Sequence, residues 1–168
     1  MSTLLSQHAS LVEAFSSAIQ RGDSLKIIYR DLEKLFCALD DPFWSRHYRF
    51  GAVSKKPIAL IGRARARDTI INVILPLTLA VAQATQNTRL ERQIFHLYEG
   101  FPCLTTNSVL QFAVYRFFGP RAPIKTLLPT ARRQQGLLQL FQDFCLNDST
   151  ACSQCSFPEL AAHWPERG

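Results

Sequence analysis

The sequence predicts an all-α fold: a single helical domain over residues 1–168, with about six helices, an irregular aromatic-rich loop and a C-terminal cysteine loop. Apolar residues recur at helical spacing almost throughout. Glycines and prolines mark most segment ends. Hydrophobic residues make up 47% of the 168 residues and charged ones 19%, which indicates a globular domain long enough to bury a core.

The first expected helix carries its apolar residues over positions 4–19 and ends near Gly22. The second begins after Ser24, a good N-cap residue, and stops at Asp40-Asp41-Pro42. An irregular segment over residues 42–62 follows, and its sequence is compatible with either a packed loop or a short hairpin.

A central apolar helix is expected to begin at Asp68, as its N-cap or first-turn acid. Its inward residues are predicted to be Ile70, Val73, Ile74, Leu77 and Val81. Pro76 predicts a kink because it removes one backbone donor, and Asn72 is expected to serve backbone groups that the kink exposes. The apolar run over residues 69–82 is shorter than the roughly 20 residues of a membrane span, so we expect no membrane partner.

Three more helices are expected. One covers residues 88–98, and the next starts at a cap on Thr106 or Asn107 and runs to Phe118. The last begins after its cap, Thr130, and delivers Cys145 at its end, with residues 137, 138, 140, 141 and 144 on its buried side.

The chain is basic, with 19 Lys and Arg against 13 Asp and Glu and a net charge of +6. Eight cations fall in two clusters and are candidates for nucleic-acid contact: Arg63, Arg65, Arg67, Arg116, Arg121, Lys125, Arg132 and Arg133. The alternative interpretation is a set of solvated arginines at helix ends.

Aromatic and basic residues alternate in the irregular segment, where the candidates are Trp44, His47, Tyr48 and Phe50. Such a segment can stack nucleic-acid bases and hold phosphates. It is equally compatible with a packed aromatic plug covered by arginine stems.

Three of the five cysteines lie within residues 145–155, and Cys145, Cys152 and Cys155 have a spacing that lets thiolates converge on zinc or an iron–sulfur cluster. Cys103 and His163 are the candidates for a fourth ligand. A redox pair of Cys152 and Cys155 and three unpaired thiols are the alternatives. The chain shows no secretory signal at its start, so we expect a cytoplasmic, reducing location.

Common catalytic motifs are absent: the sequence contains no GxGxxG, P-loop, HExxH or GxSxG pattern. The chain is therefore expected to be non-catalytic by itself. A metal-dependent enzyme ranks third among the hypotheses, because no general base accompanies the cysteines.

Four segments occur in a fixed order: "DPFWSRHYRFG", "IINVILPLTLA", "ARRQQGLLQLF" and "FC" followed by "CSQCSFP". Together they resemble the C-terminal part of the bacterial domain of unknown function family 2851, over roughly residues 40–160. The residues that carry the resemblance are Trp44, His47, Tyr48, Phe50, Gly51, Asn72, Pro76, Gln135, Leu137, Leu140, Phe144, Cys145, Cys152 and Cys155.

The resemblance implies that this chain corresponds to the C-terminal half of a longer architecture whose N-terminal half is expected to be nuclease-like and carries acidic "GPDF" and "VE.H" patterns. This chain contains neither pattern. We therefore expect an accessory module that contacts nucleic acid and is stapled by a metal. The alternative is a protein-interaction half that packs on an N-terminal domain or a partner chain.

Overall fold

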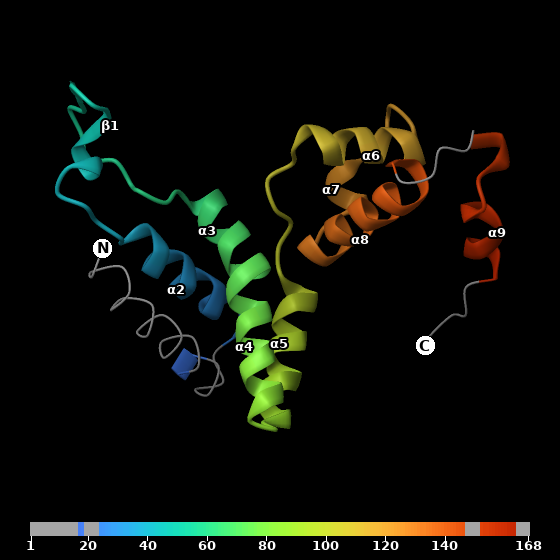
Figure 1. Ribbon diagram of the computed structural model, residues 1–168, viewed down its shortest axis with the longest axis horizontal. Helices are drawn as coiled ribbons and strands as arrows, with labels where there is room; N and C mark the ends of the chain where they lie inside the picture. Colours follow the sequence, from blue (N-terminus) through green and yellow to red (C-terminus); the bar gives the residue numbers. More distant parts are fainter. Residues whose placement is uncertain (1–16, 19–23, 147–151, 164–168) are drawn as a thin grey trace. The chain divides into compact units, whose positions relative to one another are not determined.

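The computed structural model describes residues 17–18, 24–146 and 152–163, with the side chain of Cys152 excluded (Figure 1). The described residues are mainly helical with one two-stranded sheet, which confirms the all-α prediction. The first expected helix, over residues 4–19, lies outside the described residues apart from positions 17 and 18. Contacts divide the chain into two compact units, residues 1–104 and 105–168.

The first unit contains four described helices, a 3-10 turn, a hairpin and one π-helical segment. In chain order these are α2 (Leu25–Cys37), the 3-10 turn (Trp44–Arg46), β1 (His47–Arg49), β2 (Ala52–Val53), α3 (Arg63–Thr69), the π-helical segment (Ile70–Ile74), α4 (Leu75–Ala84) and α5 (Thr88–Gly100). Helices α4 and α5 lie side by side, and α2 packs on α3 (Figure 1).

Helix α2 contacts the C-terminal end of α5 through Tyr29. The Tyr29 hydroxyl donates to the Leu97 carbonyl at 2.5 Å, and its ring meets Phe101 edge-on with centroids 4.8 Å apart. Leu97 belongs to the last four residues of α5, whose carbonyls lack the usual helical donors. The phenol therefore satisfies a helix end while its ring covers fully buried Phe101.

The central helix differs from the prediction in its start and its orientation. It begins at Arg63, five residues before Asp68, and a π-helical segment precedes Pro76. There the Leu75 amide bonds to the Ile70 carbonyl, five residues back. The Asn72 side chain donates to the Asp68 carbonyl at 2.9 Å, as expected of a residue that serves the backbone near the proline.

The inward face predicted for this helix is correct at Ile70 and Ile74 and wrong at Val73, Leu77 and Val81. These three are 52%, 51% and 44% exposed. The residues that are buried instead are Ile71, Leu75, Thr78 and Ala82. The π turn carries an extra residue, which rotates the following helix relative to a regular α-helical register.

The second unit contains α6 (Ser108–Phe118), α7 (Ile124–Leu127), α8 (Ala131–Phe141), a π-helical segment (Gln142–Leu146), a 3-10 turn (Cys152–Gln154) and α9 (Phe157–Ala162). Its core includes Leu110, Val114, Leu137 and Phe141. The expected caps are present: Asn107 accepts from the Leu110 amide, and Thr130 from the Arg133 amide. Of the five residues predicted on the buried side of the last helix, 137 and 141 are buried and the others half-buried.

Candidate functional site

A groove of about 760 Å³ lies in the first unit, lined mainly by residues of α2 and α3. Five cations line it: Lys26, Arg30, Lys34, Arg63 and Arg67. Glu33 is the one carboxylate among the described lining residues. A strong excess of one charge along a concave surface attracts anions and raises their local concentration.

The three cations on α2 follow from the sequence of that helix. Lys26, Arg30 and Lys34 are four residues apart, so they form one stripe along it, while Ile28, Leu32 and other apolar residues face inward. Each four-residue step advances about 6 Å along the helix axis. The stripe therefore places three cationic side chains in a line.

Two cations on α3 complete the groove. Arg63 and Arg67 are one turn apart and share a side of α3, whereas Arg65 is not among the lining residues. Arg67 donates through Nε to Glu33 Oε1 at 2.6 Å, and this ion pair ties α3 to α2. Glu33 is only 13% exposed, so the pair fixes the Arg67 guanidinium at the groove wall.

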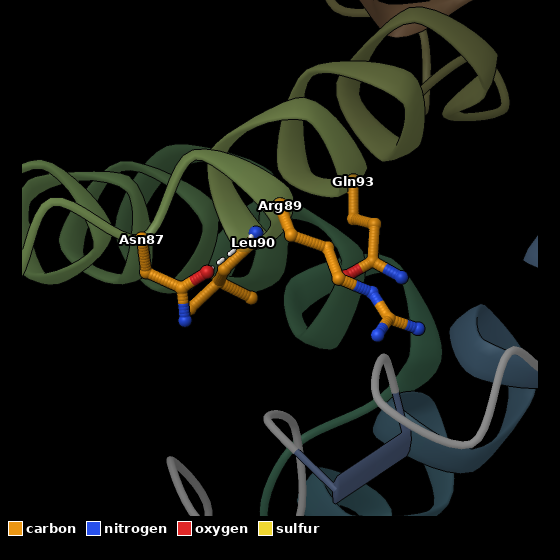
Figure 2. Close-up of a pocket in the computed structure, with 4 residues that line it drawn as sticks. All are labelled: Asn87, Arg89, Leu90 and Gln93. Atoms are coloured by element: carbon orange, nitrogen blue, oxygen red, sulfur yellow. Dashed lines mark hydrogen bonds between the residues drawn. The ribbon is translucent and has the colours of Figure 1, made fainter.

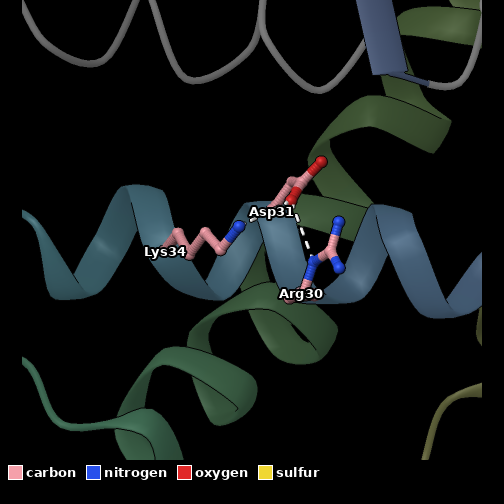
Figure 3. A network of polar contacts seen from close by, with 3 residues as sticks. All are labelled: Arg30, Asp31 and Lys34. Carbon is pink, nitrogen blue, oxygen red and sulfur yellow. Dashed lines mark hydrogen bonds and ion pairs between the residues drawn. The ribbon is translucent and has the colours of Figure 1, made fainter.

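Asp31 pairs with two of the groove cations from beside the groove (Figure 3). Its carboxylate lies 3.3 Å from Arg30 Nε and 3.4 Å from Lys34 Nζ. Desolvation raises the pKa of Asp31, but the hydrogen bonds from Arg30 and Lys34 outweigh it and hold that pKa below its ordinary value. Neither Lys26 nor Arg63 forms an ion pair with another residue in the part of the chain that the structure describes.

The aromatic hairpin, defined here as residues 43–53, connects α2 to α3 in the first unit (Figure 1). Its strands pair His47 with Val53 and Arg49 with Ala52, and Gly51 takes a φ of 76° at the turn. Of the two structures that the sequence allowed here, a packed loop or a short hairpin, the structure has the hairpin. Asp41 starts the segment, because its Oδ1 accepts from the backbone amides of residues 43 and 44 at 2.9 and 2.8 Å.

The rings of the aromatic hairpin contact one another and also reach solvent. Phe43 and His47 stack with centroids 3.9 Å apart, and Trp44 and Phe50 meet at 5.1 Å. Tyr48 and Phe50 are nevertheless 73% and 82% exposed. The aromatic hairpin thus combines rings that pack on one another with rings that face water.

The remaining predicted cations lie in the second unit and are all exposed. Arg116 is on α6, Lys125 on α7, and Arg132 and Arg133 on the first turn of α8, while Arg121 lies between α6 and α7. They are spread over three helices and a connection.

The cysteine loop is described only in part, because residues 147–151 and the Cys152 side chain lie outside the described residues. Cys145 is half-buried and packs against the core of the second unit. Its neighbour Phe144 contacts Phe157 with centroids 5.1 Å apart, which brings the segments of Cys145 and Cys155 together. Among the described side chains, no three candidate ligands are grouped as a metal site requires.

The two candidates for a fourth ligand lie in different units. His163 directly follows α9, and its Nδ1 lies 2.8 Å from the Glu159 carbonyl. A carbonyl only accepts, so Nδ1 is the donor, and Nε2 is the ring nitrogen that would bind a metal. Cys103 is half-buried at the end of the first unit.

Two further hollows occur in the first unit. A pocket of about 330 Å³ is lined by Asn87, Arg89, Leu90 and Gln93 (Figure 2), where the Asn87 side chain is occupied as the N-cap of α5. An apolar hollow of about 180 Å³ lies between α4 and α5 beside Pro76 and Phe95. Neither has the charge of the groove.

The groove cations on α2 were not among the residues predicted from the sequence. Their four-residue spacing is visible there, but a stripe of cations on a helix usually indicates a solvated face. The fold adds the missing information, because it places Arg63 and Arg67 on the same groove as that stripe.

The family described as "Protein of unknown function (DUF2851)" matches residues 2–105 of the chain. The match includes the segments around Trp44 and Pro76 and ends at the junction between the two units, before α8 and Cys145. No curated protein and no solved structure matches the chain. Among the described residues, no helix is both long and apolar enough to cross a membrane.

Proposed function

The chain belongs to the family described as "Protein of unknown function (DUF2851)", and we propose that it is a non-catalytic module that binds nucleic acid. The observation that carries the proposal is the groove with five cations and one carboxylate among its described lining residues. Phosphate contacts supply most of the affinity of sequence-independent nucleic-acid binding, and Lys and Arg are the residues that make them.

The test measures how the affinity for a labelled oligonucleotide depends on salt, using fluorescence anisotropy on the full chain. If all five groove cations contact phosphates, the slope of log K against log[salt] is about −3.5 for a single strand and about −4.5 for a duplex. The double variant Lys26→Gln/Arg63→Gln removes two such contacts. Its slope should be smaller in magnitude by about 1.5.

Arg89→Gln is the matched control, because Arg89 is an exposed cation of the same unit that does not line the groove. It should leave the slope nearly unchanged. No binding at low salt, binding that ignores salt, or an equal loss in the control would each refute the groove as the binding site.

We also propose that a metal staples the cysteine loop through Cys145, Cys152 and Cys155, with His163 or Cys103 as the fourth ligand. Two observations support this: the contact between Phe144 and Phe157, and the contact of His163 Nδ1 with the Glu159 carbonyl, which makes Nε2 the nitrogen that would bind the metal. Zinc would suit four such ligands, and an iron–sulfur cluster would suit the thiolates. Metal analysis and an absorbance spectrum of anaerobically purified protein test it. Stoichiometric metal that is lost in Cys155→Ser is expected, and metal-free protein contradicts the staple.

The described cysteines Cys37, Cys103, Cys145 and Cys155 form no disulfide, which supports a proposed cytoplasmic location. Detection of the chain in a fractionated cell, by antibody, tests this location. Recovery of the protein from the exported fraction would contradict it.

A second candidate function is protein interaction, and the exposed stripe of Val73 in the π-helical segment with Leu77 and Val81 on α4 favours it. Exposed apolar stripes of this kind commonly mark protein–protein contacts. The candidate predicts that the isolated chain self-associates and that Val73→Gln/Leu77→Gln reduces the association in analytical ultracentrifugation. A monomer at all concentrations, with unchanged solubility in the variant, would count against it.

A further inference from the structure

The groove alone does not distinguish a single strand from a duplex, because both present phosphates. We infer that the aromatic hairpin is a base-stacking platform, so that the ligand is a single-stranded nucleic acid whose phosphates lie in the groove. This inference rests on the proposed function and specifies its ligand class.

The first observation is the exposure of the rings. Tyr48 and Phe50 are 73% and 82% exposed, and Trp44 is 41% exposed. Aromatic faces that point to water at one site are available for stacking, and every nucleobase offers a matching face. A duplex keeps its bases stacked inside, so only an unpaired strand presents them to the hairpin.

The second observation is that Phe50, one of the two most exposed rings of the hairpin, packs on the rings of Phe43 and Trp44. The Phe43 and His47 rings are parallel within 2°, and His47 Nδ1 lies 2.8 Å from the Phe43 carbonyl. Trp44 and Phe50 pack together, and the Trp44 amide donates to the Asp41 carboxylate. Rings that are already held in place lose little conformational entropy when a nucleobase stacks on them, which favours affinity.

The third observation is the charge around the hairpin. Residues 42–67 contain seven Lys and Arg and no Asp or Glu. The cations on the hairpin and just after it, Arg46, Arg49, Lys55 and Lys56, are all exposed. Asp41, just before this range, is taken up by the Phe43 and Trp44 amides. Aromatic rings interleaved with cations match a ligand that carries bases on an anionic backbone.

The fourth observation is the connection between the hairpin and the groove. The hairpin lies in the segment that links α2 to α3, the two helices that supply the groove cations. The stripe on α2 advances about 6 Å per cation, close to the spacing of successive phosphates in an extended strand. A strand that follows the stripe toward the C-terminal end of α2 therefore runs toward the hairpin.

The experiment compares a labelled single strand with the duplex of the same sequence, using fluorescence anisotropy on the full chain. Tyr48→Ala/Phe50→Ala should weaken binding of the single strand by tenfold or more, at about tenfold per stacked base, and leave duplex binding within about twofold. Trp44 fluorescence should be quenched by the single strand. Tyr115→Ala is the control, because Tyr115 is a 56% exposed ring of the second unit.

The outcomes separate this inference from the proposed function. Equal affinity for both ligands, unchanged in the hairpin variant, overturns the platform and leaves the groove proposal standing. No binding of either ligand at low salt overturns both. If the hairpin variant loses binding to phosphatidylserine–phosphatidylcholine vesicles and keeps its single-strand affinity, the hairpin contacts lipid and the inference is wrong.

Discussion

Removing the hydroxyl of Tyr29 tests how much its hydrogen bond stabilises the packing of α2 on α5. Tyr29 is 6% exposed, and its hydroxyl donates to a carbonyl in the last turn of α5. Tyr29→Phe keeps the ring and its contact with Phe101 but leaves the Leu97 carbonyl without this donor. A buried acceptor left unsatisfied costs about 1–2 kcal/mol, and we expect the free energy of unfolding to fall by that amount at pH 8.

The same contact makes stability depend on alkaline pH. Burial raises the pKa of Tyr29 from 10.0 to about 12. Below pH 10 the Tyr29 hydroxyl is protonated in both the folded and the unfolded state, so its full contribution to stability is present. Between pH 10 and 12 the unfolded state loses the proton first, and stability falls as pH rises. By pH 11 the loss is about 1.4 kcal/mol.

The assay is urea unfolding, followed by circular dichroism, of the native protein and Tyr29→Phe at pH 8 and pH 11. Other groups titrate alike in both proteins, so the difference between them isolates Tyr29. The stability gap should shrink at pH 11, because only the native protein loses the Tyr29 contribution. Tyr48→Phe, at a 73% exposed ring, should change stability by less than about 0.5 kcal/mol. A gap that stays constant or widens at pH 11 refutes the reasoning.

Five further predictions concern single residues. Gly119→Ala should lower the free energy of unfolding by about 1 kcal/mol in urea, because φ is +83° at that position. Gly136→Ala should raise it by about 0.5–1 kcal/mol, because Gly136 is an exposed position inside α8. Phe101→Ala, at a fully buried ring, should cost about 3–5 kcal/mol in the same assay. Asn87→Ala should cost about 1 kcal/mol and increase amide exchange in the first turn of α5, since its cap is lost. Glu33→Gln should raise oligonucleotide affinity severalfold in anisotropy, because it removes the negative charge from the groove while the Gln amide oxygen can still accept from Arg67 Nε; unchanged or lower affinity would contradict this.

Local chemistry made most helices predictable from the sequence. Ser24, Asn107 and Thr130 precede α2, α6 and α8 as expected. The side chains of Asn107 and Thr130 cap the first turn of their own helix, whereas the Ser24 side chain makes no cap hydrogen bond. The end of α6 at Gly119 follows in the same way. Short α7 has no strong periodic pattern in four residues and was not predicted.

The central helix shows where local patterns are insufficient. Its sequence from Ile70 to Ala84 is apolar on most sides, so no polar face fixes which residues point inward. The π turn before Pro76 then shifts the register within the helix. Arg63 starts the helix without a side-chain cap at Gly62, which explains why the sequence favoured the later start at Asp68.

The groove could not be predicted because it joins residues more than 25 positions apart. Lys34 and Arg63 approach a common surface only because α2 packs on α3, and the ion pair of Glu33 with Arg67 holds them there. Both the groove and the aromatic hairpin lie within residues 2–105, the range of the family match, whereas Cys145 lies beyond it. The nucleic-acid proposal therefore depends on residues inside the matched range. The metal proposal depends mainly on residues outside it, so either can fail without the other.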